Sequence, residues 1–189
     1  CPEPQLCGTD DMIWKGDSFI EVDSQGEILW EWDTFDYLSL DEYNSQWVGS
    51  PVSGQIDWTH SNSVFFDEGS NIVYISMRNL SRITAIDYTT KEIIWNFGDP
   101  DFMDQIFFED NFGFSHQHSA QITHEGNLSF FDNGRQNHPE VSRCLEIGFN
   151  EDEEPALIWE YVLPDSMLTL SRGECDRLIN GNALITAGR

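Results

Sequence analysis

The sequence predicts an all-β protein built from repeated antiparallel units. Three observations support this fold class: short runs that alternate apolar and polar residues, the lack of a sustained 3.6-residue apolar period, and a hairpin pattern that occurs three times. The 189 residues correspond to one domain or two. Because 39% of the residues are hydrophobic and 13% aromatic, the chain can bury a sizeable core.

The charge balance excludes two classes of partner. The chain carries 34 Asp and Glu against 9 Lys and Arg, a formal net charge of −25. Nucleic acids and anionic membrane surfaces bind basic patches, so we expect neither as a partner. No stretch approaches about 18 uncharged apolar residues, so we also expect no transmembrane helix.

The clearest repeat is an alternating strand, a turn and a second strand that ends on Trp. The first copy is Phe19–Trp30 and the second is Ile83–Trp95. A looser third copy runs from Arg143 to Trp159 through a longer acidic turn. The three Trp residues are 65 and 64 residues apart, so we predict three equivalent hairpins.

Two more strands recur three times in the same phase, and the first two of these pairs precede the second and third hairpins. The nearer strands are expected at Asn71–Ser76, Asn127–Phe131 and Asn182–Thr186, and the strands before them at Thr59–Phe65, Gln117–Thr123 and Cys175–Ile179. The result is a four-stranded antiparallel unit about every 55–65 residues. Helical turns are expected only between units, at Leu38–Tyr43 and Gln105–Phe108.

A four-stranded unit at this interval is typical of a β-propeller blade, whose first strand lines the central channel and whose last is outermost. A β-sandwich of the same strands is the alternative, and the regular period favours the propeller. Propellers typically close with about four to eight blades, whereas this chain holds roughly three. We therefore predict that residues 1–189 are a partial β-propeller, truncated at both ends.

The candidate site residues lie on the predicted innermost strands. His60 and Asn62 share one such strand and, by alternation, one face of it. His118 lies on the innermost strand of the next unit, and Arg78 closes a neighbouring strand. Because inner strands of neighbouring blades converge on the channel, His60 and His118 can approach each other there.

Imidazole, guanidinium and amide groups together suit a tetrahedral oxyanion. Arginine offers a fixed fork of donors, a neutral histidine can act as nucleophile, and a second histidine can give a proton to a leaving oxygen. The alternatives are hydrogen-bonded structural histidines, an Arg78–carboxylate pair, or a metal site at His60 and His118, which no H-x-E motif or cysteine set supports. The other histidines are interpreted as turn or surface residues: His116, His124 and His138.

Several motifs also occur together in one known family. They are residues 57–64, 75–79, 83–98, 114–120, 130–134, 142–143, 158–161 and 180–182. In this order and spacing, from about Asp17 to the end, the chain resembles the arylsulfotransferases that work without the nucleotide sulfate donor PAPS.

The resemblance implies a six-bladed propeller that transfers a sulfuryl group from an aryl sulfate donor to a phenolic acceptor. The family's transiently sulfated histidine matches His118. Its His-x-Asn pair matches His60 and Asn62, and its arginine matches Arg78. A further family histidine from an earlier blade has no counterpart, because no His precedes His60. The amino-terminal β-sandwich of bacterial members is not seen either.

The resulting hypothesis is a fragment of a PAPS-independent aryl sulfotransferase that needs no metal or organic cofactor. In it, Arg78 and Asn62 hold the sulfuryl oxygens and His60 assists the phenolic oxygen. The alternative is a non-catalytic propeller that binds a ligand or a partner protein, because one fold can host many functions. Since the family is largely exported, we expect a periplasmic or extracellular protein.

The four cysteines form no Cys-x-x-Cys pair, which weakens a zinc or thioredoxin-like interpretation. Cys1 and Cys7 lie six residues apart in a Pro-rich segment, where free thiols or a local disulfide are both compatible with the sequence. Export of the family favours the disulfide. Cys144 and Cys175 fall on strands of successive units, so we expect them to be separate thiols.

Overall fold

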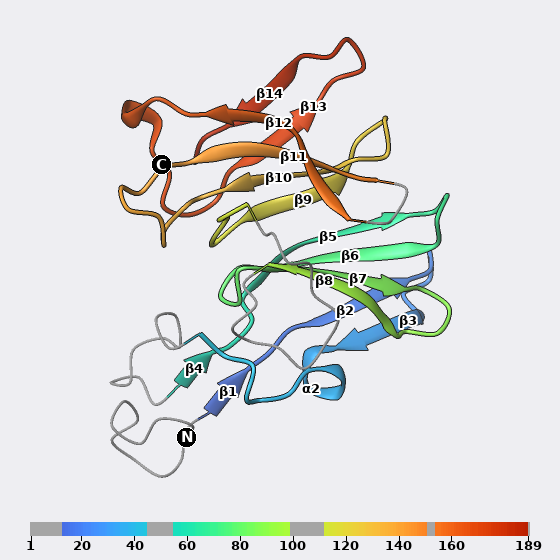
Figure 1. Cartoon of the computed structure of the whole chain (residues 1–189). Coiled ribbons are helices and arrows are strands. Elements are labelled where there is room, and N and C mark those ends of the chain that lie inside the picture. The colour runs from blue at the N-terminus through green and yellow to red at the C-terminus, as the bar shows by residue number, and fades with distance from the viewer. Residues whose placement is uncertain (1–12, 45–54, 99–111, 151–153, 189) are drawn as a thin grey trace.

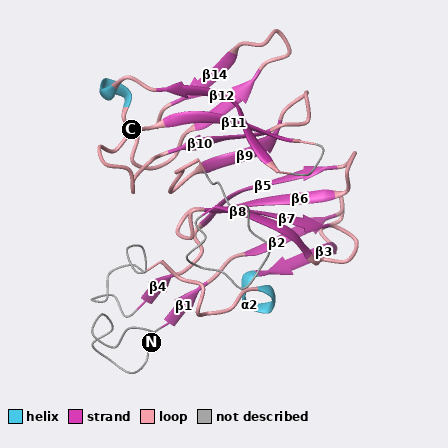
Figure 2. Ribbon diagram, viewed as in Figure 1, coloured by secondary structure: helices cyan, strands magenta, loops and turns pink. Residues whose placement is uncertain are grey.

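The computed structural model describes residues 13–44, 55–98, 112–150 and 154–188. Strands make up almost all of its regular structure, as Figure 2 shows. Within these residues the helical segments are α2 (Thr34–Tyr37) and the 3-10 turn η3 (Asp165–Met167). The prediction of an all-β protein is therefore confirmed.

One of the two predicted turns can be compared with the structure. The helix α2 begins after Asp33, whose side chain accepts a hydrogen bond from the backbone N–H of Phe35 and caps the N-terminus, and it ends at Tyr37. Within the expected segment Leu38–Tyr43 the chain makes a hydrogen-bonded turn, in which the N–H of Glu42 donates to the carbonyl of Ser39 over 2.9 Å. The expected turn at Gln105–Phe108 lies outside the described residues.

Eight strands form two four-stranded antiparallel sheets in which neighbours in sequence are neighbours in space. The first sheet contains β5 (Ser61–Asp67), β6 (Ile72–Met77), β7 (Arg82–Asp87) and β8 (Ile93–Gly98). The second sheet contains β9 (His118–Ile122), β10 (Leu128–Asp132), β11 (Arg143–Phe149) and β12 (Pro155–Val162). The predicted four-stranded unit is thus confirmed twice, with the first two strands of each shifted by one or two residues.

A hairpin lies on either side of these sheets. They are β2 (Ser18–Val22) with β3 (Ile28–Asp33), and β13 (Glu174–Arg177) with β14 (Ala183–Thr186). Figure 1 shows the hairpins and sheets stacked in chain order, from blue to red. A short parallel pair, β1 (Ile13–Lys15) with β4 (Gln55–Asp57), lies beside the first hairpin.

The Trp hairpins are equivalent, as predicted. Trp30 lies on β3, Trp95 on β8 and Trp159 on β12, each the last strand of its sheet. The indole N–H of Trp30 donates to the carbonyl of Tyr88 over 2.8 Å, and the two rings stack. This contact attaches the first hairpin to the first sheet.

The core fills the spaces between successive layers. Phe130 packs between the two sheets, whereas the next residue, Phe131, packs between the second sheet and β13. Both side chains are fully buried, although successive residues of a strand point to opposite faces. The second sheet is therefore covered on both faces, which is why all five residues of β10 are buried, the polar Ser129 and Asp132 included.

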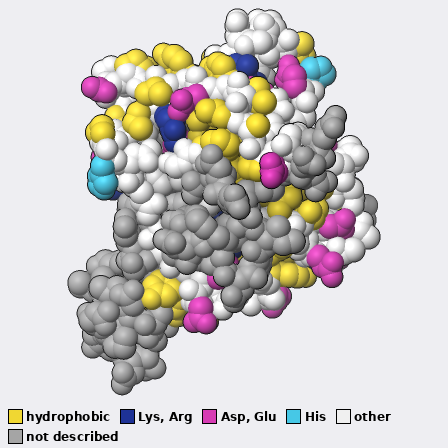
Figure 3. All heavy atoms as spheres, in the orientation of Figure 1, with side chains coloured by type: hydrophobic (Ala, Val, Ile, Leu, Met, Phe, Trp, Pro, Cys, Tyr) yellow, Lys and Arg dark blue, Asp and Glu magenta, His cyan; other side chains and the backbone are white. Residues whose placement is uncertain are grey.

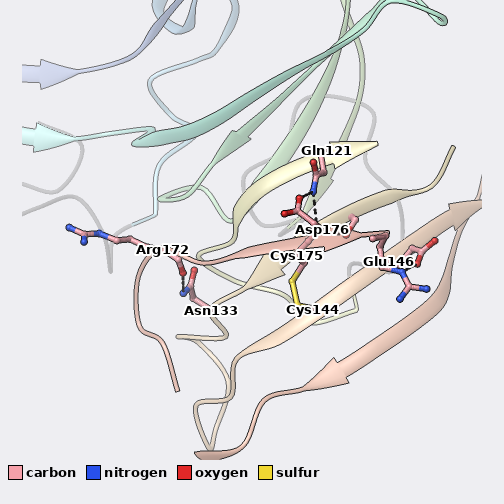
Figure 4. Close-up of a disulfide and its surroundings, with 9 residues drawn as sticks. Gln121, Asn133, Cys144, Glu146, Arg172, Cys175 and Asp176 are labelled. Atoms are coloured by element: carbon pink, nitrogen blue, oxygen red, sulfur yellow. Dashed lines mark hydrogen bonds and ion pairs between the residues drawn. A yellow bond between two sulfur atoms is a disulfide. The ribbon is translucent and has the colours of Figure 1, made fainter. Parts of the chain in front are cut away.

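Cys144 and Cys175 form a disulfide, shown in Figure 4. It joins β11 to β13, with 5.9 Å between the two Cα atoms. The prediction of separate thiols is wrong: the two strands belong to successive units, as expected, but the units pack face to face. Both cysteines point into the shared apolar cluster with Phe131 and Leu163. Cys1 and Cys7 lie outside the described residues.

Charged side chains are distributed in two ways. On the face drawn in Figure 3, Asp and Glu are scattered rather than gathered in one patch. In the interior, Arg82 and Glu42 form a fully buried ion pair with an N–O distance of 2.6 Å. In the part of the chain that the structure describes, no helix has the length and apolar character needed to cross a membrane.

Candidate active site

The two sheets meet along their first strands. Figure 1 shows β5 and β9, each the edge strand of its sheet, side by side. The amide of Ala120 donates to Oγ of Ser63 over 3.0 Å, and Nδ2 of Asn62 donates to the carbonyl of Gln117 over 2.7 Å. The predicted adjacency of these strands is confirmed, and it brings Asn62 next to the residue that precedes His118.

The chain enters each first strand through a residue with a left-handed backbone. These residues are His60 (φ 46°), His116 (φ 62°) and Arg172 (φ 69°), spaced 56 residues apart. A positive φ is unfavourable for residues with a Cβ atom, so its recurrence at one point of three units marks a feature of the repeat. His60 therefore corresponds to His116, and Asn62 to His118.

This alignment corrects one detail of the sequence analysis. His60 precedes β5 instead of lying within it, so strand alternation does not place it on one face with Asn62.

The hydrogen bonds of His118 define its tautomer. Its Nδ1 lies 2.6 Å from Oδ1 of Asn133 and 3.2 Å from the carbonyl of His116, whereas Nε2 accepts the backbone N–H of Arg172 over 3.1 Å. The orientation of the Asn133 amide is fixed, because Nδ2 donates to the carbonyls of Thr169 and Arg172, the latter bond visible in Figure 4. Nδ1 therefore carries the proton and Nε2 the lone pair.

His118 is also kept neutral. It is buried, and burial is the main cause that lowers the pKa of its imidazole below the usual 6.5. The positive charge of Arg78 lowers this pKa further, while the bond to Asn133 raises it. At neutral pH the ring is therefore uncharged, with a lone pair on Nε2, the form in which histidine is a nucleophile.

Arg78 links the two sheets at this site. It follows β6, and its Nε donates to Nδ1 of His116 over 3.3 Å, while its backbone N–H donates to the carbonyl of His60 over 3.3 Å. Burial is the largest cause that lowers the Arg78 pKa, and the Asp57 carboxylate raises it. A guanidinium stays charged even so, which makes Arg78 a half-buried cation beside two histidines.

His60 is oriented by a carboxylate. Nδ1 of His60 forms a hydrogen bond with Oδ2 of Asp57, and this bond is the largest cause that lowers the Asp57 pKa. The preceding and following residues are held by Asp17, whose Oδ2 accepts from Oγ1 of Thr59 over 2.5 Å and from the amide of Ser61 over 2.7 Å. The Asp57 carboxylate favours a proton on Nδ1, so Nε2 of this partly exposed ring can exchange protons with a ligand.

Comparison with known proteins identifies the family of the chain. A sequence model described as Arylsulfotransferase (ASST) matches residues 7–188, almost the whole chain. The chain belongs to the arylsulfotransferase family. A comparison with curated proteins found no match. Arylsulfotransferase membership indicates sulfuryl transfer between small-molecule substrates.

In this arylsulfotransferase chain, the interpretation of His116 as a turn or surface residue is wrong, because its side chain is fully buried at the candidate site. Burial, followed by the charges of Arg78 and Arg135, lowers its pKa to about 3. The 56-residue spacing from His60 was the signal that could have revealed it. His124 and His138 are exposed, as predicted.

The sequence analysis also does not predict three other residues of the candidate site in this arylsulfotransferase chain. Asn133 follows β10, within a segment that the resemblance already included, and Asp57 lies three residues before His60. Gln117 is fully buried, and its Nε2 lies within hydrogen-bond distance of three acceptors: Oγ of Ser76 at 3.1 Å and the carbonyls of Met77 at 3.3 Å and Arg82 at 2.8 Å. Local sequence carries no signal for such contacts.

Two further findings bear on ligands. Among the described residues, no group of three or more His, Cys, Asp or Glu side chains is arranged to hold a metal ion. The buried Oδ1 of Asn62 has no hydrogen-bond partner in this same part of the chain. Since a buried polar atom normally has a partner, this oxygen is suited to accept a hydrogen bond from a ligand group that donates one.

Proposed function

We propose that the chain is part of a PAPS-independent aryl sulfotransferase with a sulfohistidine intermediate at His118. The proposal depends above all on the state and surroundings of the His118 ring. His118 is neutral, it carries its lone pair on Nε2, and Arg78 and His60 lie close enough for their charges to influence its pKa. A nucleophile, an anion-binding cation and a proton-transfer group are what this transfer requires.

The first half-reaction loads the histidine. The lone pair on Nε2 of His118 forms a bond to the sulfur of the aryl sulfate, and the bond from sulfur to the phenolic oxygen breaks. The departing oxygen keeps the electron pair and takes a proton from protonated His60. The positive charge that develops on the His118 ring is stabilised by the bond from Nδ1–H to Asn133.

The second half-reaction reverses these roles. The oxygen of the phenolic acceptor attacks the same sulfur while His60 takes the phenolic proton, and the sulfur–nitrogen bond breaks to return His118 to its neutral form. Arg78 and the second N–H of the Asn62 amide hold the sulfuryl oxygens in both steps. Protons and electron pairs balance without a metal or an organic cofactor.

The fold and the disulfide support two wider parts of the proposal. Stacked four-stranded antiparallel sheets that meet along their first strands agree with blades of a propeller, and we propose that residues 1–189 form part of a six-bladed one. The bond between Cys144 and Cys175 agrees with export to the periplasm or the extracellular space, because disulfides persist in oxidising compartments.

The test is to trap the intermediate in the full protein. Incubation with 4-nitrophenyl sulfate and no acceptor is expected to add the mass of one sulfuryl group to the peptide that contains His118. This adduct is expected to be acid-labile, because a protonated imidazole is a good leaving group. The variant His118→Ala removes the nucleophile and should lose both the adduct and transfer, whereas His124→Ala, at an exposed turn, should lose neither.

Two outcomes would contradict the proposal. If wild-type protein transfers sulfuryl groups while the His118 peptide stays unmodified, transfer is direct and needs no sulfohistidine. If no aryl sulfate is turned over and His118→Ala lowers only the stability, the chain is a binding module with a structural histidine.

A further inference from the structure

Arg78 and His116 belong to different sheets and meet through their side chains. Arg78 follows β6 of the first sheet, and His116 precedes β9 of the second. The Nε–H of Arg78 donates to Nδ1 of His116 over 3.3 Å, and the imidazole is completely buried. The contact therefore connects the two halves of the site in a place that solvent does not reach.

The kind of partner separates Arg78 from other arginines of the chain. Arg82 pairs with Glu42, Arg143 with Asp132 and Glu160, and Arg177 with Glu146. No carboxylate is bonded to Arg78 among the residues that the structure describes. In a protein with 34 acidic residues, this arginine has an uncharged imidazole as its acceptor instead.

The choice of acceptor has a chemical consequence. A carboxylate would accept from two guanidinium nitrogens and compensate their charge. A neutral imidazole accepts one hydrogen bond through Nδ1, which occupies only Nε of Arg78. The two Nη nitrogens then remain for an anionic ligand, and the nearby Asp57 carboxylate acts on the guanidinium charge through space, without a direct ion pair.

This arrangement requires that His116 stay neutral. A protonated ring would present an N–H to Arg78 and repel its charge. The surroundings of His116 prevent this: burial and the positive charges of Arg78 and Arg135 lower its pKa to about 3, and protonation of His118 would add to this repulsion, while the Leu170 backbone acts in the opposite direction. The acceptor on Nδ1 is therefore present throughout the pH range in which the protein would work.

We propose that His116 is a positioning residue that fixes the Arg78 guanidinium with its Nη edge toward the sulfuryl group. This inference rests on the proposed function for the identity of the anion. The bond between Arg78 and His116 itself does not depend on it.

The mutational test uses variants that suit the left-handed backbone at this position. His116→Gly removes the acceptor without backbone strain, whereas His116→Asn keeps an oxygen near Nδ1 and tolerates a positive φ. We expect His116→Gly to lower kcat/KM about 10- to 100-fold, since small misplacements of a binding group can cost about 10²-fold, and His116→Asn to recover most of the loss. The exposed His124→Asn is the matched control.

A double-mutant cycle separates positioning from a structural role. In the Arg78→Lys background the guanidinium is absent, so adding His116→Gly should change kcat/KM little. The dissociation constant of an aryl sulfonate, a probe that cannot transfer its sulfur, should also change little. Equal losses in both backgrounds would overturn the proposal.

A spectroscopic test remains decisive if His116→Gly does not fold or if the full protein transfers no sulfuryl group. Nitrogen NMR of the wild-type protein should show a coupling through the hydrogen bond between Nε of Arg78 and Nδ1 of His116. Failure to find that coupling in folded protein, with both signals assigned, would refute the positioning role. Loss of activity with the coupling present would contradict only the proposed function.

Discussion

The backbone N–H of Arg172 donates to Nε2 of His118 over 3.1 Å. Arg172 belongs to the unit that follows the second sheet, so this next unit covers the nitrogen proposed to attack sulfur. The same segment accepts a bond from Asn133 through the carbonyl of Arg172. One lone pair cannot accept this N–H and bind sulfur at once, so the bond must break during transfer.

Sulfation of His118 should therefore release the Arg172 amide. In the presence of an aryl sulfate without acceptor, we expect this amide to exchange its hydrogen faster than in free protein. Hydrogen exchange followed by mass spectrometry or NMR measures the change. The amide of Gly126, which donates to Thr123 in a distant turn, serves as the control. An unchanged Arg172 amide in fully sulfated protein would rule out the proposed geometry of attack.

The pKa of His118 predicts the acidic limb of the reaction. Its folded pKa lies below 6.5, so the neutral nucleophile persists below that pH, and kcat/KM should fall only at lower pH. Arg78→Gln removes a charge that lowers this pKa, so the limb should move to higher pH. Arg78→Lys keeps the charge and should leave the acidic limb of the pH profile in place. It should still lower the rate about 10²–10³-fold, because lysine lacks the planar set of guanidinium N–H donors. Limbs at the same pH in both variants would contradict this account.

The burial of neutral His116 predicts how stability depends on pH. Its pKa is about 3 in the folded protein against 6.5 in the unfolded chain, so between these values the unfolded state binds the extra proton. This contribution is fully present above pH 6.5 and is lost progressively as the pH falls toward 3. In His116→Asn, the dependence of the unfolding free energy on pH should be smaller by up to about 1.4 kcal/mol per pH unit. Urea unfolding at pH 7 and pH 5 measures it, and identical slopes would show that His116 is not buried as a neutral ring.

The disulfide is expected to hold two units together. Cys144 and Cys175 are 31 residues apart, and closing a loop of this length stabilises a protein by about 3–4 kcal/mol in the chain-entropy description. The double variant Cys144→Ala, Cys175→Ala should lower the unfolding free energy by that amount, measured in denaturant. Since both side chains are buried, alanine avoids adding a buried hydroxyl. An unchanged free energy would mean that the bond is not formed in the folded protein.

Gly134 is expected to be essential for the position of Asn133. It has φ 60°, and a Cβ atom would lie 1.8 Å from the carbonyl oxygen of Val141. Gly134→Ala should therefore lower the unfolding free energy by at least about 3 kcal/mol and reduce transfer, because Asn133 would move away from His118. Gly126→Ala is the matched control: its φ is 85°, but nothing lies within 4 Å of the added atom, so the cost should stay at about 1–2 kcal/mol. Equal effects of the two variants on thermal unfolding would contradict this explanation.

The repeat and its strands could be predicted from the sequence because local patterns encode them. Alternation follows from the two-residue period of a strand, and the Trp hairpins recur because each unit packs the same surface against its neighbour. The family motifs likewise brought His118, His60, Asn62 and Arg78 into one hypothesis before any geometry was known.

The disulfide and the burial of the site residues depended on how the units pack against each other. Whether Cys144 meets Cys175 is decided by two sheets that lie face to face, not by either strand. Whether His116 is exposed is decided by its neighbours from three units, which bury the ring and hold it neutral. The sequence by itself thus determined the strands, their repeat and the chemical groups available to the site. Only the tertiary structure decided their burial, tautomers and partners, because these arise from contacts between residues far apart in the chain.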